Sequence, residues 1–183
     1  MDKDLLEKIQ KVDPTFNEAM FKSKVDNMFI MILSSIMQGN LDKVRHFLGE
    51  DLEEKYDKQI EKLNKNNHKQ MYDELNVKDT SIDDVTITED KIIIDVTIIS
   101  RYMDYIVDKD SFDFVSGIND RRIEKTNELT IEKKIQTKDI KAVRKCPGCG
   151  VSISVNTSGK CEYCGRIFNQ EAYDYVITDI ETY

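Results

Sequence analysis

The sequence is poor in the residues that build many enzyme active sites, with two histidines and seven glycines among 183 residues. Several of the glycines lie beside cysteines, so few remain for a glycine-rich phosphate-binding loop, and none is visible. Neither His46 nor His68 has a cysteine, serine or acidic neighbour in a recognisable catalytic arrangement. We therefore read both as surface histidines and expect a protein that is not an enzyme.

Long apolar runs are also lacking. The most apolar stretch, MFIMILSSIM, is too short to span a bilayer and fits a buried core helix. Its cluster of Met28, Phe29, Met31 and Met37 can alternatively line a ligand pocket, although core packing is the simpler role. The first residues lack the apolar segment of a secretory signal, and no basic amphipathic helix is seen. We expect a cytoplasmic protein that does not bind anionic membranes strongly.

The charge balance narrows the class of partner. Charged residues make up 34% of the chain and the formal net charge is -8, which suits a soluble globular protein. An acidic protein is not attracted to the phosphates of nucleic acid, so no nucleic-acid partner is expected.

Apolar periodicity predicts helices first and strands afterwards. Asp13 and Pro14 mark the start of a long helix that ends at Gly39; LDKVRHFL forms a short helix, and another helix begins near Asp51. Beyond Leu75 the period becomes twofold, as in the alternating isoleucines of KIIIDVTIIS. Leu129 and Ile131 mark a later strand, and residues 108–120 are interpreted as a turn-rich connection, with a short strand inside it as the alternative. This order predicts an α+β fold, with helices on one face of an antiparallel sheet.

Two further segments have defined patterns. RYMDY, residues 101–105, combines aromatic and charged residues, which fits either the end of an amphipathic strand or the rim of a concave sheet. EAYDYVITDI, residues 171–180, alternates and predicts a final strand. Since the short cysteine-containing segment before it offers too little surface for two tyrosines, this strand is expected to pack on that segment or on the main sheet.

Four cysteines form the clearest chemical motif. They make two Cys-x-x-Cys-Gly units in a chain with no other cysteine: Cys146, Cys149, Cys161 and Cys164. Four thiolates close a tetrahedron around a structural Zn²⁺ and leave no position for substrate, so the spacing predicts a zinc ribbon. A rubredoxin-type iron site has the same ligands, whereas redox dithiols would need thioredoxin-like surroundings that are absent. Nucleic-acid contact by the locally basic ribbon is the weaker alternative.

The whole pattern resembles a known family. The chain is similar to bacterial relatives of subunit 44 of the mitochondrial inner-membrane translocase. The segments that carry the resemblance are TFNEAMFKSKV, LEEKYDKQIEKL and KIIIDVTIISRYMDYIVDK, followed by CPGCG and SGKCEYCG. The resemblance implies a Tim44-like domain at residues 1–140, in which N-terminal helices pack on a curved sheet in a cone similar to nuclear transport factor 2 and cystatin. A zinc ribbon with a C-terminal strand follows at residues 141–183, and the four cysteines match the metal ligands of the family.

The function implied by the resemblance is that of a scaffold. The mitochondrial relative docks an import motor beside a channel and is not an enzyme. We therefore expect a non-enzymatic, zinc-binding adaptor whose partner is another protein, with a link to protein translocation. The alternative is a carrier or sensor that holds a small apolar, lipid-like ligand in the cavity of the cone.

Overall fold

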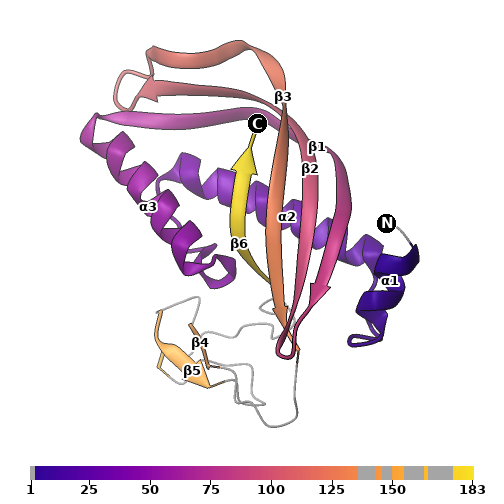
Figure 1. Ribbon diagram of the computed structural model, residues 1–183. Helices are drawn as coiled ribbons and strands as arrows, with labels where there is room; N and C mark the ends of the chain where they lie inside the picture. Colours follow the sequence, from indigo (N-terminus) through magenta and orange to yellow (C-terminus); the bar gives the residue numbers. More distant parts are fainter. Residues whose placement is uncertain (1–2, 136–142, 146–149, 155–162, 165–174) are drawn as a thin grey trace.

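The computed structural model describes residues 3–135, 143–145, 150–154, 163–164 and 175–183. Within these ranges, helices form the first part of the chain and strands the rest, which confirms the α+β class (Figure 1). The helical elements are α1 (Lys3–Gln10), α2 (Glu18–Gln38), the 3₁₀ helix η1 (Arg45–Phe47) and α3 (Glu50–Lys65).

The long helix α2 begins later than the sequence suggested. Its N-cap is Asn17, whose side chain accepts a hydrogen bond from the backbone N–H of Met20 at 2.9 Å. Asp13 belongs instead to the preceding turn, where it accepts from Thr15, so its predicted role as a helix cap is wrong. Gly39 ends α2 in the left-handed conformation (φ 67°), as expected. The predicted LDKVRHFL helix is reduced to η1.

A four-stranded antiparallel sheet has the order β1-β2-β3-β6. Its strands are β1 (His68–Ile87), β2 (Lys91–Asp108), β3 (Phe114–Lys134) and β6 (Tyr175–Thr182).

Two strands extend beyond their expected limits. β1 begins at His68 rather than beyond Leu75, because pairing with β2 imposes an extended backbone on a polar segment without alternation. Residues 108–120 are mostly strand and not a long connection, since β3 starts at Phe114. A tight turn suffices, because the Asp108 carboxylate accepts hydrogen bonds from the backbone N–H groups of Asp110 and Ser111.

The core lies between α2 and one face of the sheet, behind the strands in Figure 1. On β2 every second residue from Ile92 to Tyr102 points into it. The apolar run of α2 supplies the opposing surface with Met28, Phe29 and Ile32, which confirms its interpretation as a core helix.

The final strand belongs to the main sheet, which confirms the expectation that the tail packs on the ribbon or the sheet. β6 pairs with β3 and buries Tyr175, Ile177 and Ile180. Its other edge is also occupied, because the backbone N–H of Gly49 donates to the carbonyl of Ile177 at 2.8 Å. A Cβ atom at Gly49 would lie 3.1 Å from Thr178 Cα, so a side chain here would push β6 away by a few tenths of an ångström.

A second, two-stranded sheet lies in the cysteine-containing segment. β4 (Val143–Lys145) and β5 (Ser152–Ser154) pair antiparallel and flank the first Cys-x-x-Cys unit. Gly150, which follows that unit, has φ 70°, a conformation that favours glycine.

Candidate functional site

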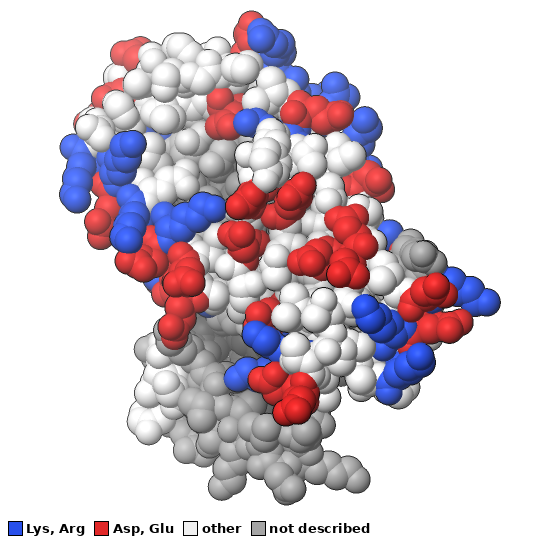
Figure 2. All heavy atoms as spheres, in the orientation of Figure 1, with Lys and Arg blue, Asp and Glu red and all other residues white. Residues whose placement is uncertain are grey.

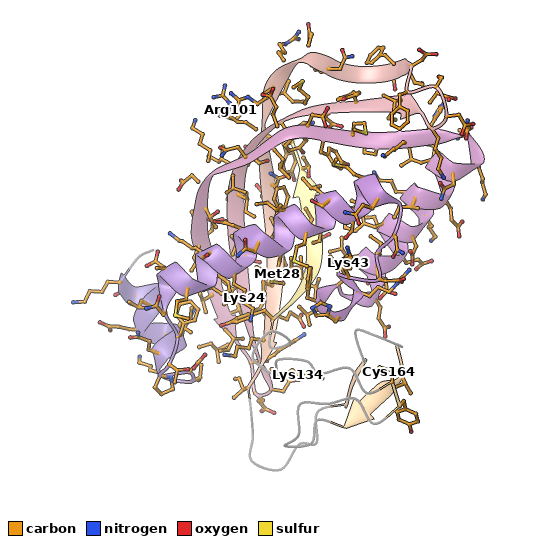
Figure 3. All side chains as sticks on the ribbon, turned by 180° about the vertical axis from the view of Figure 1, so that it is seen from behind. Lys24, Met28, Lys43, Arg101, Lys134 and Cys164 are labelled. Atoms are coloured by element: carbon orange, nitrogen blue, oxygen red, sulfur yellow. The ribbon has the colours of Figure 1, made fainter. Side chains whose placement is uncertain are left out.

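An open apolar groove runs along the outer side of α2, beside the face that packs on the sheet. Its volume is about 720 Å³, and its lining is mainly apolar. It is lined by Ala19, Met20, Ser23, Lys24, Asn27, Met28, Met31, His46 and Phe47. Figure 3 shows Met28 between Lys24 and Lys43 on this side of the molecule.

The groove has a buried floor and exposed methionine walls. Met28 and Phe47 are buried and form part of the core. Met20 and Met31, by contrast, leave 74% and 41% of their surface exposed. Unbranched methionine side chains adapt their shape to an incoming apolar group, and exposed apolar patches of this kind mark interaction sites.

The η1 side of the groove is held in place by ion pairs. Arg45, the first residue of η1, binds Glu53 at 2.6 Å and Asp57 at 2.8 Å, both on α3. These bonds fix η1 against α3 and so position the next two residues, His46 and Phe47, whose rings meet edge to face at 4.8 Å. The surface histidine expected at position 46 is in fact half-buried.

Burial lowers the pKa of His46 to about 4. The unfolded chain therefore binds more protons than the folded protein between about pH 4 and pH 6.5, and stability falls as the pH drops through this window. We expect a loss of about 1–2 kcal/mol, since partial exposure reduces the full effect. Urea unfolding at pH 7 and pH 4.5 measures it. His46→Gln should remove this part of the pH dependence, and the control His68→Gln should retain it; equal pH dependence in all three proteins would contradict the assignment.

The predicted zinc ligands lie mostly outside the described residues. Cys164 is exposed in a turn after Tyr163, whereas Cys146, Cys149 and Cys161 are not described. Among the described residues, no group of three or more His, Cys, Asp or Glu side chains is arranged to hold a metal ion. The described residues next to the first Cys-x-x-Cys unit are the paired strands β4 and β5 and Gly150 with its positive φ, and the zinc ribbon stays a prediction.

The RYMDY segment divides between the two faces of the sheet. Tyr102 is buried on the concave face, where its ring meets that of Tyr72 edge to face at 5.4 Å. Tyr105 lies on the other face and donates a hydrogen bond to Asp73 at 2.5 Å. The segment is thus an amphipathic strand and also supplies part of the concave surface.

The convex face of the sheet is acidic. Figure 2 shows carboxylates gathered over the strands. A depression in this face is lined by Asp83, Asp84, Asp95, Glu128, Asp179 and Glu181, together with Val96, Thr97, Leu129 and Thr130. Such a surface repels polyanions.

The family of the chain follows from its sequence. The family model of the Tim44-like domain matches residues 3–141. The chain therefore belongs to the Tim44-like domain family, and the α+β architecture of helices on an antiparallel sheet is consistent with it. A comparison with curated proteins gives no match. No helix in the described ranges combines the length and the apolar character that crossing a membrane requires.

The sequence indicated only part of the groove lining. Met28 and Met31 belong to an apolar cluster that was assigned mainly to the core, with a ligand pocket as the alternative. The available signal for the groove was a second stripe on the helix, beside the stripe that faces the core. Its residues recur at helical spacing: Met20, Lys24, Asn27 and Met31. The contribution of η1 had no local signal, because it depends on how Arg45 contacts α3.

Proposed function

We propose that the protein is a non-enzymatic adaptor that binds another protein through the groove on α2. The observation that carries the proposal is an apolar, methionine-walled groove on the surface of a domain whose core is packed with large apolar side chains. A partner that inserts apolar side chains would cover Met20 and Met31 and contact the buried floor beneath them. Membership of the Tim44-like family supports a protein partner and a link to protein translocation.

We also propose that a structural Zn²⁺ is held by Cys146, Cys149, Cys161 and Cys164. In this role the metal would fold the ribbon and take no part in a reaction, because four thiolates leave it no open position. The protein as a whole would act in the reducing cytoplasm, where thiolates remain available to metal. Neither nucleic acid nor anionic membrane is a favoured partner, given the acidic convex face.

The alternative role, a carrier of an apolar ligand inside the cone, has less support. Large side chains of α2 and the sheet occupy the space between these two layers, including Phe29, Ile32 and Ile98. The groove on α2 is open rather than enclosed, which suits a protein segment better than a ligand that must be shielded from water.

The experiment that tests the adaptor role places a photo-crosslinking residue at Met31 in living cells. A defined protein adduct is expected, and Met20→Glu should reduce its yield about tenfold, because burying a carboxylate in an apolar contact is costly. The stability of the Met20→Glu protein should change by less than about 0.5 kcal/mol, since this side chain is exposed.

The matched control places the crosslinker at Lys58, an exposed position on α3. This position should not give the same adduct. The adaptor proposal fails if both positions crosslink the same proteins equally, or if Met20→Glu leaves the Met31 adduct unchanged in a correctly folded protein.

A further inference from the structure

A second pocket lies at the end of the molecule where α3 runs into β1 and where the turn between β2 and β3 also lies (Figure 1). It is formed by the last turns of α2 and α3, the start of β1 and the β2–β3 turn, and its volume is about 490 Å³. This volume falls in the range in which small ligands bind. The described residues that line it are all different from those that line the groove on α2.

Hydrogen bonds hold the parts of this pocket together. The backbone N–H of Lys109, in the β2–β3 turn, donates to the carbonyl of Asn67 at 2.8 Å and so ties the turn to the link between α3 and β1. The side chain of Asn67 also donates to Asp110, in the same turn, at 2.9 Å. Phe112 of this turn adopts φ 59°, which is rare for a bulky residue, and it lines the pocket although 59% of its surface is exposed. The turn thus holds an exposed aromatic side chain at the pocket.

The buried side of the pocket is apolar. Ile36 of α2 and Ile60 of α3 belong to the core, and the neighbouring Met37 and Leu63 are half-buried. The apolar body of a ligand that covered these side chains would leave water together with them, which favours binding.

Two ammonium groups lie on the polar side of the pocket. Lys69 of β1 lies over the ring of Phe112, with Nζ 5.4 Å from the ring centroid. Lys109 donates a hydrogen bond from Nζ to Oδ1 of Asn64 at 3.2 Å. Phe112 and Asn64 themselves line the pocket, so both ammonium groups lie beside it. Neither ammonium forms an ion pair with a carboxylate in the described part of the chain.

The charge of the pocket is opposite to that of the protein as a whole. Its described lining contains no Asp or Glu, although these residues outnumber Lys and Arg by 35 to 27 in the chain. Asp108 and Asp110 lie in the adjacent turn, but their carboxylates accept from Asn67 and do not line the pocket. The carbonyl end of a helix carries roughly half a negative charge, so the ends of α2 and α3 together offset about one of the two ammonium groups. A positive charge therefore remains among the lining groups.

We propose that this pocket binds a compact organic carboxylate, with its anionic group at Lys69 and Lys109 and its apolar body on Ile36 and Ile60. Hydrogen bonds between an ammonium and a carboxylate are shorter and stronger than those between neutral groups. His68 also lines the pocket and can donate a further hydrogen bond. The ligand site is separate from the groove on α2, so it does not depend on the partner of that groove.

Competing classes of ligand fit less well. A cation would be repelled by Lys69 and Lys109. An uncharged apolar molecule would take water from both ammonium groups without replacing it, which costs free energy. A small inorganic anion would leave the apolar side of the pocket uncovered. A carboxylate with an apolar body occurs both as a free acid and as the last residue of a peptide, so the experiment must separate these two sources.

The test is a calorimetric titration of the full-length protein with 3-phenylpropionate, beside 3-phenylpropionamide, its uncharged analogue of nearly the same shape. The carboxylate is expected to bind at least about tenfold more tightly than the amide. Lys69→Met and Lys109→Met should each weaken binding of the carboxylate about tenfold, because each removes one charged donor. Added salt should also weaken it, since salt screens the attraction at this partly exposed site.

Lys62→Met is the matched control, because Lys62 is an exposed lysine of α3 outside the described lining and its loss changes the net charge equally. Thermal unfolding shows whether each variant is folded, and shifts of the Phe112 and His68 signals in NMR spectra locate the ligand. An acetylated tripeptide that ends in phenylalanine, titrated beside its C-terminal amide, separates the sources. Tighter binding of the peptide acid than of 3-phenylpropionate assigns a chain terminus, and the reverse order assigns a free acid.

The proposal is overturned if the acids and their amides bind equally, or if neither 3-phenylpropionate nor the peptide acid binds. It is also overturned if a folded protein with both Lys69→Met and Lys109→Met binds the carboxylate as well as the unaltered chain does. The comparison of acid with amide uses the unaltered chain, so it decides the question even where a variant loses stability.

Discussion

Deleting residues 172–183 is expected to unfold the domain or leave it only marginally stable. The deletion removes β6, whose Tyr175, Ile177 and Ile180 are buried in the core. Each fully buried large side chain contributes about 1.5–3 kcal/mol, so the sum approaches the total stability of an ordinary domain. The deletion also leaves the N–H of Gly49 without its partner at Ile177. Circular dichroism and the midpoint of urea unfolding measure the loss.

Point substitutions in β6 test whether its stabilising effect comes from the side chains that it buries in the core. Ile177 is fully buried, so Ile177→Ala should cost about 2–4 kcal/mol. The adjacent Val176 points to the other face and is only half-buried, so Val176→Ala should cost clearly less. Equal losses at the two positions, or an unchanged unfolding midpoint in the deletion variant, would show that β6 is not docked in solution as described.

Elemental analysis of freshly purified protein is expected to give one zinc per chain, bound at sulfur distances of about 2.3 Å. Cys149→Ser should release the metal and unfold the ribbon, because metal binding supplies the folding free energy of so small a module. A chelator should have the same effect on the unaltered chain, seen as exchange broadening or loss of the amide signals of β4 and β5 in NMR spectra.

The matched control for the metal prediction is Ser152→Ala, an exposed position in β5, which should keep its zinc. Gly150→Ala should weaken the site without abolishing it, since φ 70° is costly for a residue with a Cβ atom. Protein that contains no metal but paired disulfides would contradict the prediction. Iron with the absorption of a tetrathiolate centre would favour the rubredoxin-type alternative.

The sequence predicted correctly those elements whose pattern depends only on residues close together in the chain. The isoleucines of β2 alternate without interruption, and α2 carries a continuous apolar stripe that ends at a glycine. These signals depend on neighbouring residues only, and the structure confirms both elements. Asp13 failed as a cap because Asn17, four residues later, is an equally good cap and lies nearer to the apolar stripe.

Features that depend on distant residues were not predictable in the same way. The first part of β1 is polar, and only its pairing with β2 makes it a strand. The ring contact between Tyr72 and Tyr102 likewise had no sequence signal, because only the pairing of β1 with β2 brings the two residues together. The four cysteines show the opposite case, since their spacing indicates a metal although three of them lie outside the described structure.

Because β3 and β6 are antiparallel neighbours, the cysteine-containing segment between them is a single insertion, or cassette, that can be replaced without moving either strand. Lys133 in β3 and Tyr175 in β6 are register partners and therefore lie side by side. The roughly forty residues between them thus leave the sheet and return to it at neighbouring positions. A two-residue Asn-Gly turn joins antiparallel strands at this spacing. Replacing the cassette with such a turn should leave the four-stranded sheet intact and shorten the loop that folding must close. The four-stranded sheet should thus accept or lose the cysteine-containing segment by insertion at a single hairpin, with no change to the strand order.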